Sequence, residues 1–77
     1  MTWPIENNKL TKTFTFPDFK EALKFVNKVG LIAETLQHHP EISFTWGKVV
    51  ISITTHDNGN TVTEKDYELA TGIDKLS

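Results

Sequence analysis

Three histidines and two acidic residues within residues 34–66 have the types and spacing that acid-base chemistry needs. His38 and His39 are adjacent, His56 follows later, and Glu34 and Asp66 flank the group. Histidine has an ordinary pKa of about 6.5, so it can give or take a proton near neutral pH. A histidine pair followed by a proline, with a third histidine placed after a predicted strand, therefore predicts proton-transfer chemistry.

The elements that must position these residues can be predicted from hydrophobic period. Alternation of apolar and polar residues, or a run of β-branched residues, is typical of strands. A proline near the start of the first stretch favours the edge of a sheet there. The last two stretches predict a hairpin. The four predicted strands are residues 3–7, 9–16, 42–46 and 49–55.

Two helices are predicted from capping residues and a helical repeat. Asp18 with Glu21 resembles a capping box, and the helix that follows is expected to run to about Gln37. Thr63 with Asp66 predicts the start of a second helix. Apolar residues at steps of three and four define the inner faces. These are Phe19, Ala22, Val26, Val29, Ala33 and Leu36 in the first helix, and Leu69, Ala70, Ile73 and Leu76 in the second.

The order of elements predicts an α+β fold, a four-stranded antiparallel sheet with both helices packed on one face (β-β-α-β-β-α). The chain has 77 residues, so we expect one domain over residues 1–77. Glu34 and His38 are four apart and would share a face of the last helical turn. We expect three parts of the chain to lie along one rim of the sheet. These are the end of that helix, the end of the fourth strand with the turn at 57–60, and the start of the second helix.

Composition excludes several classes of function. The net charge is −2 and all eight basic residues are lysine, which argues against nucleic acid, where arginine clusters are typical. Cysteine is absent, so disulfides and thiolate metal sites are excluded. No apolar run approaches the roughly 18 residues that cross a membrane, and the N-terminus lacks a signal-peptide pattern. We expect a soluble, cytoplasmic protein without membrane or nucleic-acid partners.

The first helix has more apolar surface than one sheet would cover. Leu23, Phe25 and Ile32 extend its apolar face. In so small a chain this favours a contact with another subunit, so we expect a homodimer or homotetramer. Gly30 in the middle of the helix costs up to about 1 kcal/mol relative to alanine, which suggests a close backbone approach there.

The spacing of the acid-base residues resembles that of a known family, the pterin-4a-carbinolamine dehydratases, also called 4a-hydroxytetrahydrobiopterin dehydratases. The resemblance covers residues 10–76 and includes the stretch 14–19 before the histidines. The family pattern is an acidic residue, three residues, His-His-Pro, five residues, an aromatic, nine residues, a histidine, and an aspartate at the start of the last helix. It is met by Glu34, His38, His39, Pro40, Trp46, His56 and Asp66.

The resemblance implies an enzyme, a hydro-lyase that dehydrates 4a-hydroxytetrahydropterin to quinonoid dihydropterin in tetrahydrobiopterin recycling. It implies that His38 and His56 form the catalytic acid-base pair, that His39 binds and orients the pterin, and that no metal or redox cofactor is used. Glu34 and Asp66 would support the imidazoles. The substrate-binding residues implied in this way are Glu34, Pro40, Trp46 and Asp66. Trp3 is added because a tryptophan borders the pterin in relatives.

Other interpretations remain open at this point. Glu34, His38 and His56 could form a two-histidine, one-carboxylate metal site, because Glu and His four apart can face one ion. Asp66 could serve only as a helix cap. The chain could also be a non-catalytic protein-binding module or dimerisation cofactor, a role known for animal relatives of the family.

Overall fold

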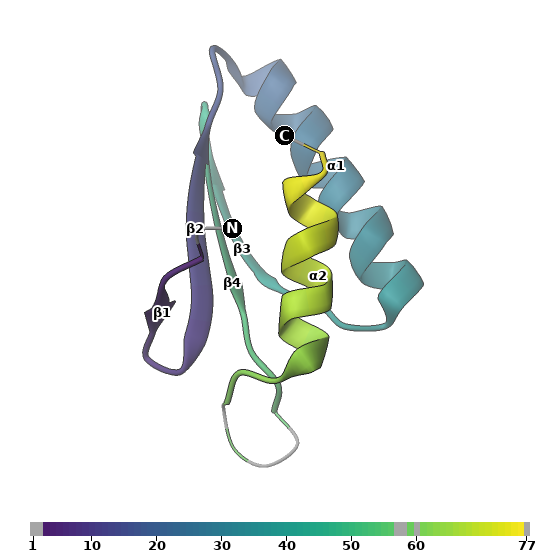
Figure 1. Ribbon diagram of the computed structural model, residues 1–77. Coiled ribbons are helices and arrows are strands. Elements are labelled where there is room, and N and C mark those ends of the chain that lie inside the picture. The colour runs from purple at the N-terminus through teal and green to yellow at the C-terminus, as the bar shows by residue number, and fades with distance from the viewer. Residues whose placement is uncertain (1–2, 57–58, 60, 77) are drawn as a thin grey trace.

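The computed structural model describes residues 3–56, 59 and 61–76. It contains four strands and two helices (Figure 1). Most of the predicted turn at 57–60 lies outside the described residues, and Gly59 is the one member that is described. The elements are β1 (Ile5–Glu6), β2 (Lys9–Thr15), α1 (Phe19–Leu36), β3 (Glu41–Thr45), β4 (Lys48–Ile53) and α2 (Glu64–Asp74).

The sheet is antiparallel throughout, and its strands lie in the order β1-β2-β4-β3. Leu10 pairs with Ile53 and Phe14 pairs with Val49, so β4 lies at the centre beside β2. Both helices cover the same face of the sheet (Figure 1). The predicted α+β fold with the order β-β-α-β-β-α is therefore confirmed.

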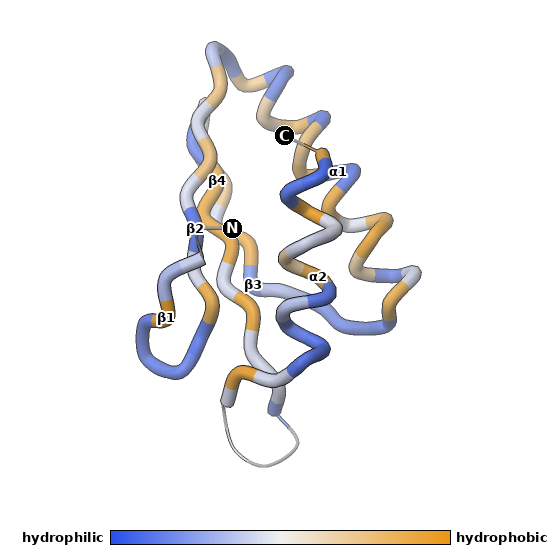
Figure 2. The backbone as a smooth tube through the Cα atoms, viewed as in Figure 1, coloured by the Kyte–Doolittle hydropathy of each residue, from blue (hydrophilic) through white to orange (hydrophobic). Residues whose placement is uncertain are grey.

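The core lies between that face of the sheet and the two helices. Side chains alternate along a strand, so every second residue of β2 and β4 points to the helices. Figure 2 shows the hydrophobic positions recurring along the strands and helices that face each other. The opposite face of the sheet carries mainly threonine, serine and lysine side chains, and we call it the open face. The buried apolar residues are Trp3, Leu10, Phe14, Ala22, Phe25, Val29, Ala33, Val49, Ile51, Ile53, Leu69, Ala70 and Ile73.

The start and end of α1 follow from local hydrogen bonds. The Asp18 carboxylate accepts the backbone N–H of Glu21 at 2.9 Å, as the predicted cap requires. At the other end, Gln37 has a left-handed backbone with φ of 53°, and the backbone N–H of His38 donates to the Ala33 carbonyl at 3.1 Å. This pattern is a Schellman ending, which turns the chain sharply off the helix axis. Within the described part of the chain, neither helix is long and apolar enough to span a membrane.

The apolar surface of α1 is distributed differently from the prediction. Phe25 is buried, and its ring lies 4.7 Å from that of Phe14 and 5.0 Å from that of Phe16. Ile32 is partly buried and packs beside Gly72 of α2, where a Cβ would lie 3.2 Å from the Ile32 side chain. These two residues therefore belong to the packing of the chain itself. Phe25 packs against aromatic rings of the β2 segment, and Ile32 packs against α2.

Other apolar residues of α1 stay on the surface. Phe19, placed on the inner face by the sequence, is 49% exposed and stacks on Phe44. Leu23 and Leu31 are also exposed. The close backbone approach predicted at Gly30 is not found within the described part of the chain. Apart from the backbone of the same helix, no atom there lies within 4 Å of the position that a Cβ of Gly30 would occupy.

A polar contact ties the N-terminal segment to the end of α2. The Trp3 indole N–H donates to both oxygens of the Asp74 carboxylate, at 3.0 and 3.1 Å. Lys12 donates to the same carboxylate at 2.9 Å, and its ammonium lies 5.6 Å from the centre of the Trp3 ring. We call these three residues the Asp74 clamp. It holds the N-terminal segment against the C-terminal turn of the last helix.

Candidate active site

Three segments meet at the end of the molecule where β4 finishes. The residues after α1 bring His38 and His39, the residues after β4 bring Thr55 and His56, and the first turn of α2 brings Asp66. The predicted rim is therefore present. A pocket of about 360 Å³ opens at this rim, a size within the range of small-molecule sites. It is lined by Gln37, His38, His39, Thr54, Thr55, His56 and Lys65.

The Asp66 carboxylate is the centre of a buried hydrogen-bond network. One of its oxygens lies 2.6 Å from Nε2 of His38. The other accepts the backbone N–H of Thr63 at 2.7 Å and the hydroxyl of Thr55 at 2.9 Å. The side chain of Asp66 is fully buried, whereas that of His38 is 14% exposed. The carboxylate thus caps α2 and holds His38 at the same time.

The charge state of Asp66 decides how the His38 ring is protonated. Burial raises the pKa of the Asp66 carboxyl, whereas the hydrogen bonds from His38 and from two threonines lower it. The hydrogen bonds outweigh burial, and the pKa lies below the ordinary value for an aspartate. Asp66 is therefore an anion that can only accept, so the hydrogen of the contact resides on Nε2 of His38. This contact fixes the orientation of the His38 ring.

Glu34 contacts His39 and not His38. Nε2 of His39 lies 2.6 Å from a carboxylate oxygen of Glu34, and both side chains are more than half exposed. The prediction that Glu34 and His38 share a helical face is wrong. The helix ends at Leu36, and the left-handed Gln37 directs His38 toward α2.

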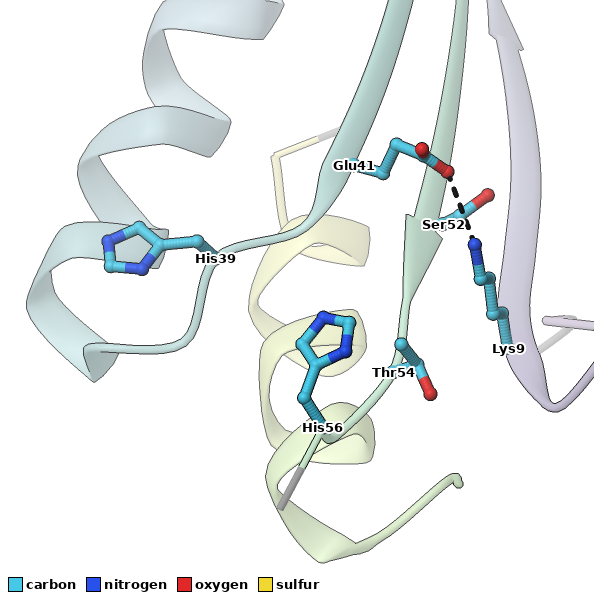
Figure 3. Close-up of a pocket in the computed structure, with 6 residues that line it drawn as sticks. All are labelled: Lys9, His39, Glu41, Ser52, Thr54 and His56. Carbon is cyan, nitrogen blue, oxygen red and sulfur yellow. Dashed lines mark hydrogen bonds and ion pairs between the residues drawn. The ribbon is translucent and has the colours of Figure 1, made fainter. Parts of the chain in front are cut away.

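His56 begins the loop after β4, and the base of this loop is closed by backbone hydrogen bonds. Thr55 and Thr61 exchange two of these bonds, at 2.9 and 3.1 Å. Thr55 points to Asp66 on the helix side, whereas His56 lines a second pocket on the open face (Figure 3). His39 lines that pocket too. The rim therefore presents His38 on the helix side of the sheet end, and His39 and His56 toward the open side.

Two tryptophans that the sequence assigned to substrate binding lie elsewhere in the chain. Trp3 is buried in the Asp74 clamp. Trp46 is 66% exposed in the β3–β4 turn, and the register places this turn at the opposite end of the sheet from His56. Pro40 does lie beside the site, between His39 and the start of β3. One copy of the chain therefore does not bring either tryptophan to the histidines.

The geometry also separates the residues of the predicted metal site. Glu34 is engaged with His39, and His38 is engaged with Asp66. Within residues 3–56, 59 and 61–76, no three histidine, aspartate or glutamate side chains come together as a set of metal ligands. The Glu34, His38 and His56 triad is not assembled.

Two functional partners were missed by the sequence interpretation. Thr55 was regarded only as the end of a strand and Thr63 only as a helix cap, yet both bind the carboxylate that holds His38. Strand alternation offered a signal for Thr55, because it follows the inward positions Ile51 and Ile53. A polar residue at an inward position requires a buried hydrogen-bond partner.

The sequence of the chain resembles those of known proteins. The family model described as pterin 4 alpha carbinolamine dehydratase matches residues 1–76. Relatives whose names assign them to pterin-4-alpha-carbinolamine dehydratase include one from Sulfurisphaera tokodaii, 47% identical over 96% of this chain and 78% of its own length. Another from Roseiflexus sp. is 46% identical over 96% of this chain and 78% of its own length.

Solved structures resemble the chain as well. A transcriptional coactivator/pterin dehydratase from Brucella melitensis superposes with a TM-score of 0.89 at 33% identity, covering 96% of this chain and 80% of its own. A pterin dehydratase-like protein described as a RuBisCO assembly factor in the alpha-carboxysome shares the fold, with a TM-score of 0.82 at 23% identity over 99% of this chain and 89% of its own. With the family model and close relatives in agreement, the chain belongs to the pterin-4-alpha-carbinolamine dehydratases, a family of hydro-lyases.

Proposed function

We propose that the protein dehydrates 4a-hydroxytetrahydropterin to quinonoid dihydropterin by histidine acid-base catalysis, as a step of tetrahydrobiopterin recycling. The observation that carries the proposal is the His38–Asp66 contact at 2.6 Å, made at the wall of a pocket that His39 and His56 also line. A buried carboxylate that fixes one nitrogen of an imidazole prepares the other nitrogen for proton transfer. Two further histidines, His39 and His56, line the same pocket.

The reaction needs one proton donor and one proton acceptor. The bond between C4a and its hydroxyl oxygen breaks, and the oxygen takes a proton and leaves as water. The proton on N5 is removed, and the electron pair of the N5–H bond forms the C4a–N5 double bond. Protons and electrons balance within the substrate and two side chains. Each positioned acid or base contributes roughly 10² to 10⁴ in rate.

Each residue has a proposed role that follows from its surroundings. His38 and His56 form the proposed acid-base pair, with Nδ1 of His38 as its exchanging atom. His39, held by Glu34, binds and orients the pterin ring. Asp66 acts through His38 by fixing its tautomer. Trp3 and Trp46 are left out of the proposed pterin site because the fold places them away from the histidines.

Self-association is part of the proposal and rests on the surface of α1. Phe19, Leu23 and Leu31 are large apolar residues that the chain leaves 49%, 40% and 70% exposed. Apolar residues gathered along one helix favour contact with a second copy. Light scattering after size exclusion is expected to give a dimer or a tetramer, and a stable monomer at micromolar concentration would contradict this.

A stopped-flow assay tests the catalytic proposal. The 4a-hydroxytetrahydropterin is generated in the instrument, and its loss is followed with wild type, His38→Ala and His56→Ala. We expect each variant to lose roughly 10²-fold or more in kcat while keeping the wild-type circular dichroism spectrum. Lys28→Gln, on the exposed surface of α1, is the control and keeps the wild-type rate. Wild-type turnover by both folded histidine variants would refute the assignment.

A further inference from the structure

Thr54 joins three segments of the chain beside the candidate active site. It directly follows β4 and lines both the larger pocket and the second pocket on the open face. The residue is 6% exposed. Its hydroxyl lies 2.9 Å from the carbonyl oxygen of Asn8 and 3.2 Å from that of Thr61. The proton-transfer chemistry proposed above makes no use of Thr54.

The hydrogen of the Thr54 hydroxyl is engaged within the chain. A threonine hydroxyl carries one hydrogen, and a carbonyl oxygen can only accept, so Thr54 is the donor in both contacts. Figure 3 shows the hydroxyl directed away from the ring of His56. Thr54 therefore acts on the site through the backbone that it holds.

The two contacts attach the end of β4 to the turn of another hairpin and to the far side of a loop. Asn7 and Asn8 connect β1 to β2 with left-handed backbones, φ of 53° and 64°. This conformation is typical of tight hairpin turns, and asparagine adopts it more readily than most residues. The second acceptor, the Thr61 carbonyl, also accepts the backbone N–H of Thr55 at 2.9 Å. Both acceptors therefore belong to backbone whose conformation is fixed independently of Thr54.

Thr54 and Thr55 hold the end of the strand from opposite faces. Side chains alternate along a strand, so the hydroxyls of two consecutive residues point to opposite sides. Thr55 donates to the Asp66 carboxylate on the helix side at 2.9 Å, whereas Thr54 donates to carbonyls on the open side. Contacts on both faces oppose rotation of the backbone about the strand axis. Such a rotation would move the next side chain, His56, relative to the pocket that it lines.

We propose that Thr54 is a positioning residue for His56, supported by the turn at Asn8. The proposal rests on the proposed function, because that function gives His56 its part in proton transfer. An acid or base must lie within hydrogen-bond reach of the reacting atom, and a misplacement of about 1 Å reduces the rate by roughly 10²-fold. The loss is expected in kcat and not in KM, because the hydroxyl of Thr54 is used within the chain.

Thr54→Val and Thr54→Ser test the proposal in the stopped-flow assay, at a temperature where melting curves show each variant to be folded. Valine keeps the shape of threonine without its hydroxyl, whereas serine keeps the hydroxyl. We expect kcat to fall by roughly 10-fold or more in Thr54→Val with KM close to wild type, and Thr54→Ser to restore kcat. Thr13→Val, at an exposed position of β2, is the matched control and keeps the wild-type values. A wild-type kcat in folded Thr54→Val would overturn the proposal.

The NMR signals of the histidine rings separate this proposal from the dehydratase proposal, because they are measured without substrate. We expect Thr54→Val to shift the ring signals of His56 and to leave those of His38, which Asp66 holds, unchanged. Thr54→Ser is expected to keep the wild-type spectrum. Asn8→Ala disfavours the left-handed backbone of the turn and is expected to shift the His56 signals less, whereas Asn8→Gly leaves them in place.

The two measurements fail in different ways. Shifted His56 signals in Thr54→Val that Thr54→Ser restores support the positioning role, even if the dehydration assay detects no turnover. Identical His56 signals in wild type, Thr54→Val and Asn8→Ala would overturn the positioning role and leave the dehydratase proposal standing.

Discussion

The two ends of α2 each carry an aspartate, and the two carboxylates have different consequences. Asp66 in the first turn holds His38, and Asp74 in the last turn holds Trp3 and Lys12. The helix dipole favours an anion at the first position and disfavours one at the second. Asp74 therefore depends on its lysine, whereas Asp66 is stabilised by backbone and hydroxyl donors even before the histidine is counted.

The difference lies in what the carboxylate holds. Asp74 binds an indole N–H and an ammonium, and neither Trp3 nor Lys12 lines the pocket at the histidines. Asp66 binds an imidazole, the type of side chain most often used for proton transfer, and His38 lines that pocket. The same type of contact is thus a structural tie at one end of the helix, and in the proposed function it positions an acid-base residue at the other. The following predictions test this comparison.

The largest effect is expected from Asp66→Asn. The oxygen of the new amide must face the Thr63 N–H and the Thr55 hydroxyl, so its NH₂ group faces Nε2 of His38. His38 would then carry its hydrogen on Nδ1, the wrong tautomer for the proposed chemistry. Reversal of a catalytic tautomer costs roughly 10² to 10⁴ in kcat. Unfolding in urea is expected to show a loss of only about 1 kcal/mol, because the cap is kept.

The outcome for Asp66→Asn distinguishes a positioning residue from a helix cap. Rates are measured by stopped flow at a temperature where the variant is folded. A kcat within threefold of wild type would show that Asp66 is only a cap. Asp74→Asn on the same helix is the matched control and is expected to keep the wild-type kcat.

A smaller effect, on stability alone, is expected from Asp74→Ala. The substitution removes the acceptor of the Lys12 ammonium and of the Trp3 indole, and the Lys12 side chain is only 25% exposed. We expect a loss of about 2 kcal/mol in the free energy of unfolding, measured in urea. Turnover per folded molecule is expected to stay at the wild-type level. A fall in kcat without a fall in stability would contradict the separation of the two ends.

Acid denaturation offers a third test, through the lowered pKa of Asp66. A carboxyl with a lower pKa in the folded than in the unfolded protein stabilises the fold fully above the unfolded value of about 3.9. This contribution is lost as the pH falls from there through the folded value. The stability of wild type is therefore expected to decrease more steeply below about pH 4 than that of Asp66→Asn. Parallel curves, measured by urea unfolding at several pH values, would contradict this.

The smallest effect is expected from Trp3→Phe. The ring contact with Phe14, 5.9 Å between centroids, can persist, but the N–H donor to Asp74 is removed. We expect a loss of about 1 kcal/mol, half of the effect of Asp74→Ala, because Lys12 still pairs with the carboxylate. A substantial rise in KM for the pterin would instead return Trp3 to the substrate site.

Much of this molecule could be predicted from local patterns. Alternation and helical period were sufficient for the four strands and two helices, because these signals depend on neighbours within a few residues. The caps at Asp18 and Thr63 were predictable for the same reason. The candidate site was predictable as a set of residue types, since histidines and carboxylates at fixed separations resembled a family pattern.

The pairing of these residues came from the tertiary structure alone. Which carboxylate holds which histidine depends on the left-handed turn at Gln37, which directs His38 to Asp66 and leaves Glu34 for His39. The place of Trp3 depends on a contact with Asp74, 71 positions away along the chain. Spacing along the sequence determines which types of chemistry are available. Which groups meet is decided by the tertiary structure, because these contacts join segments that are far apart along the chain and that local patterns cannot relate.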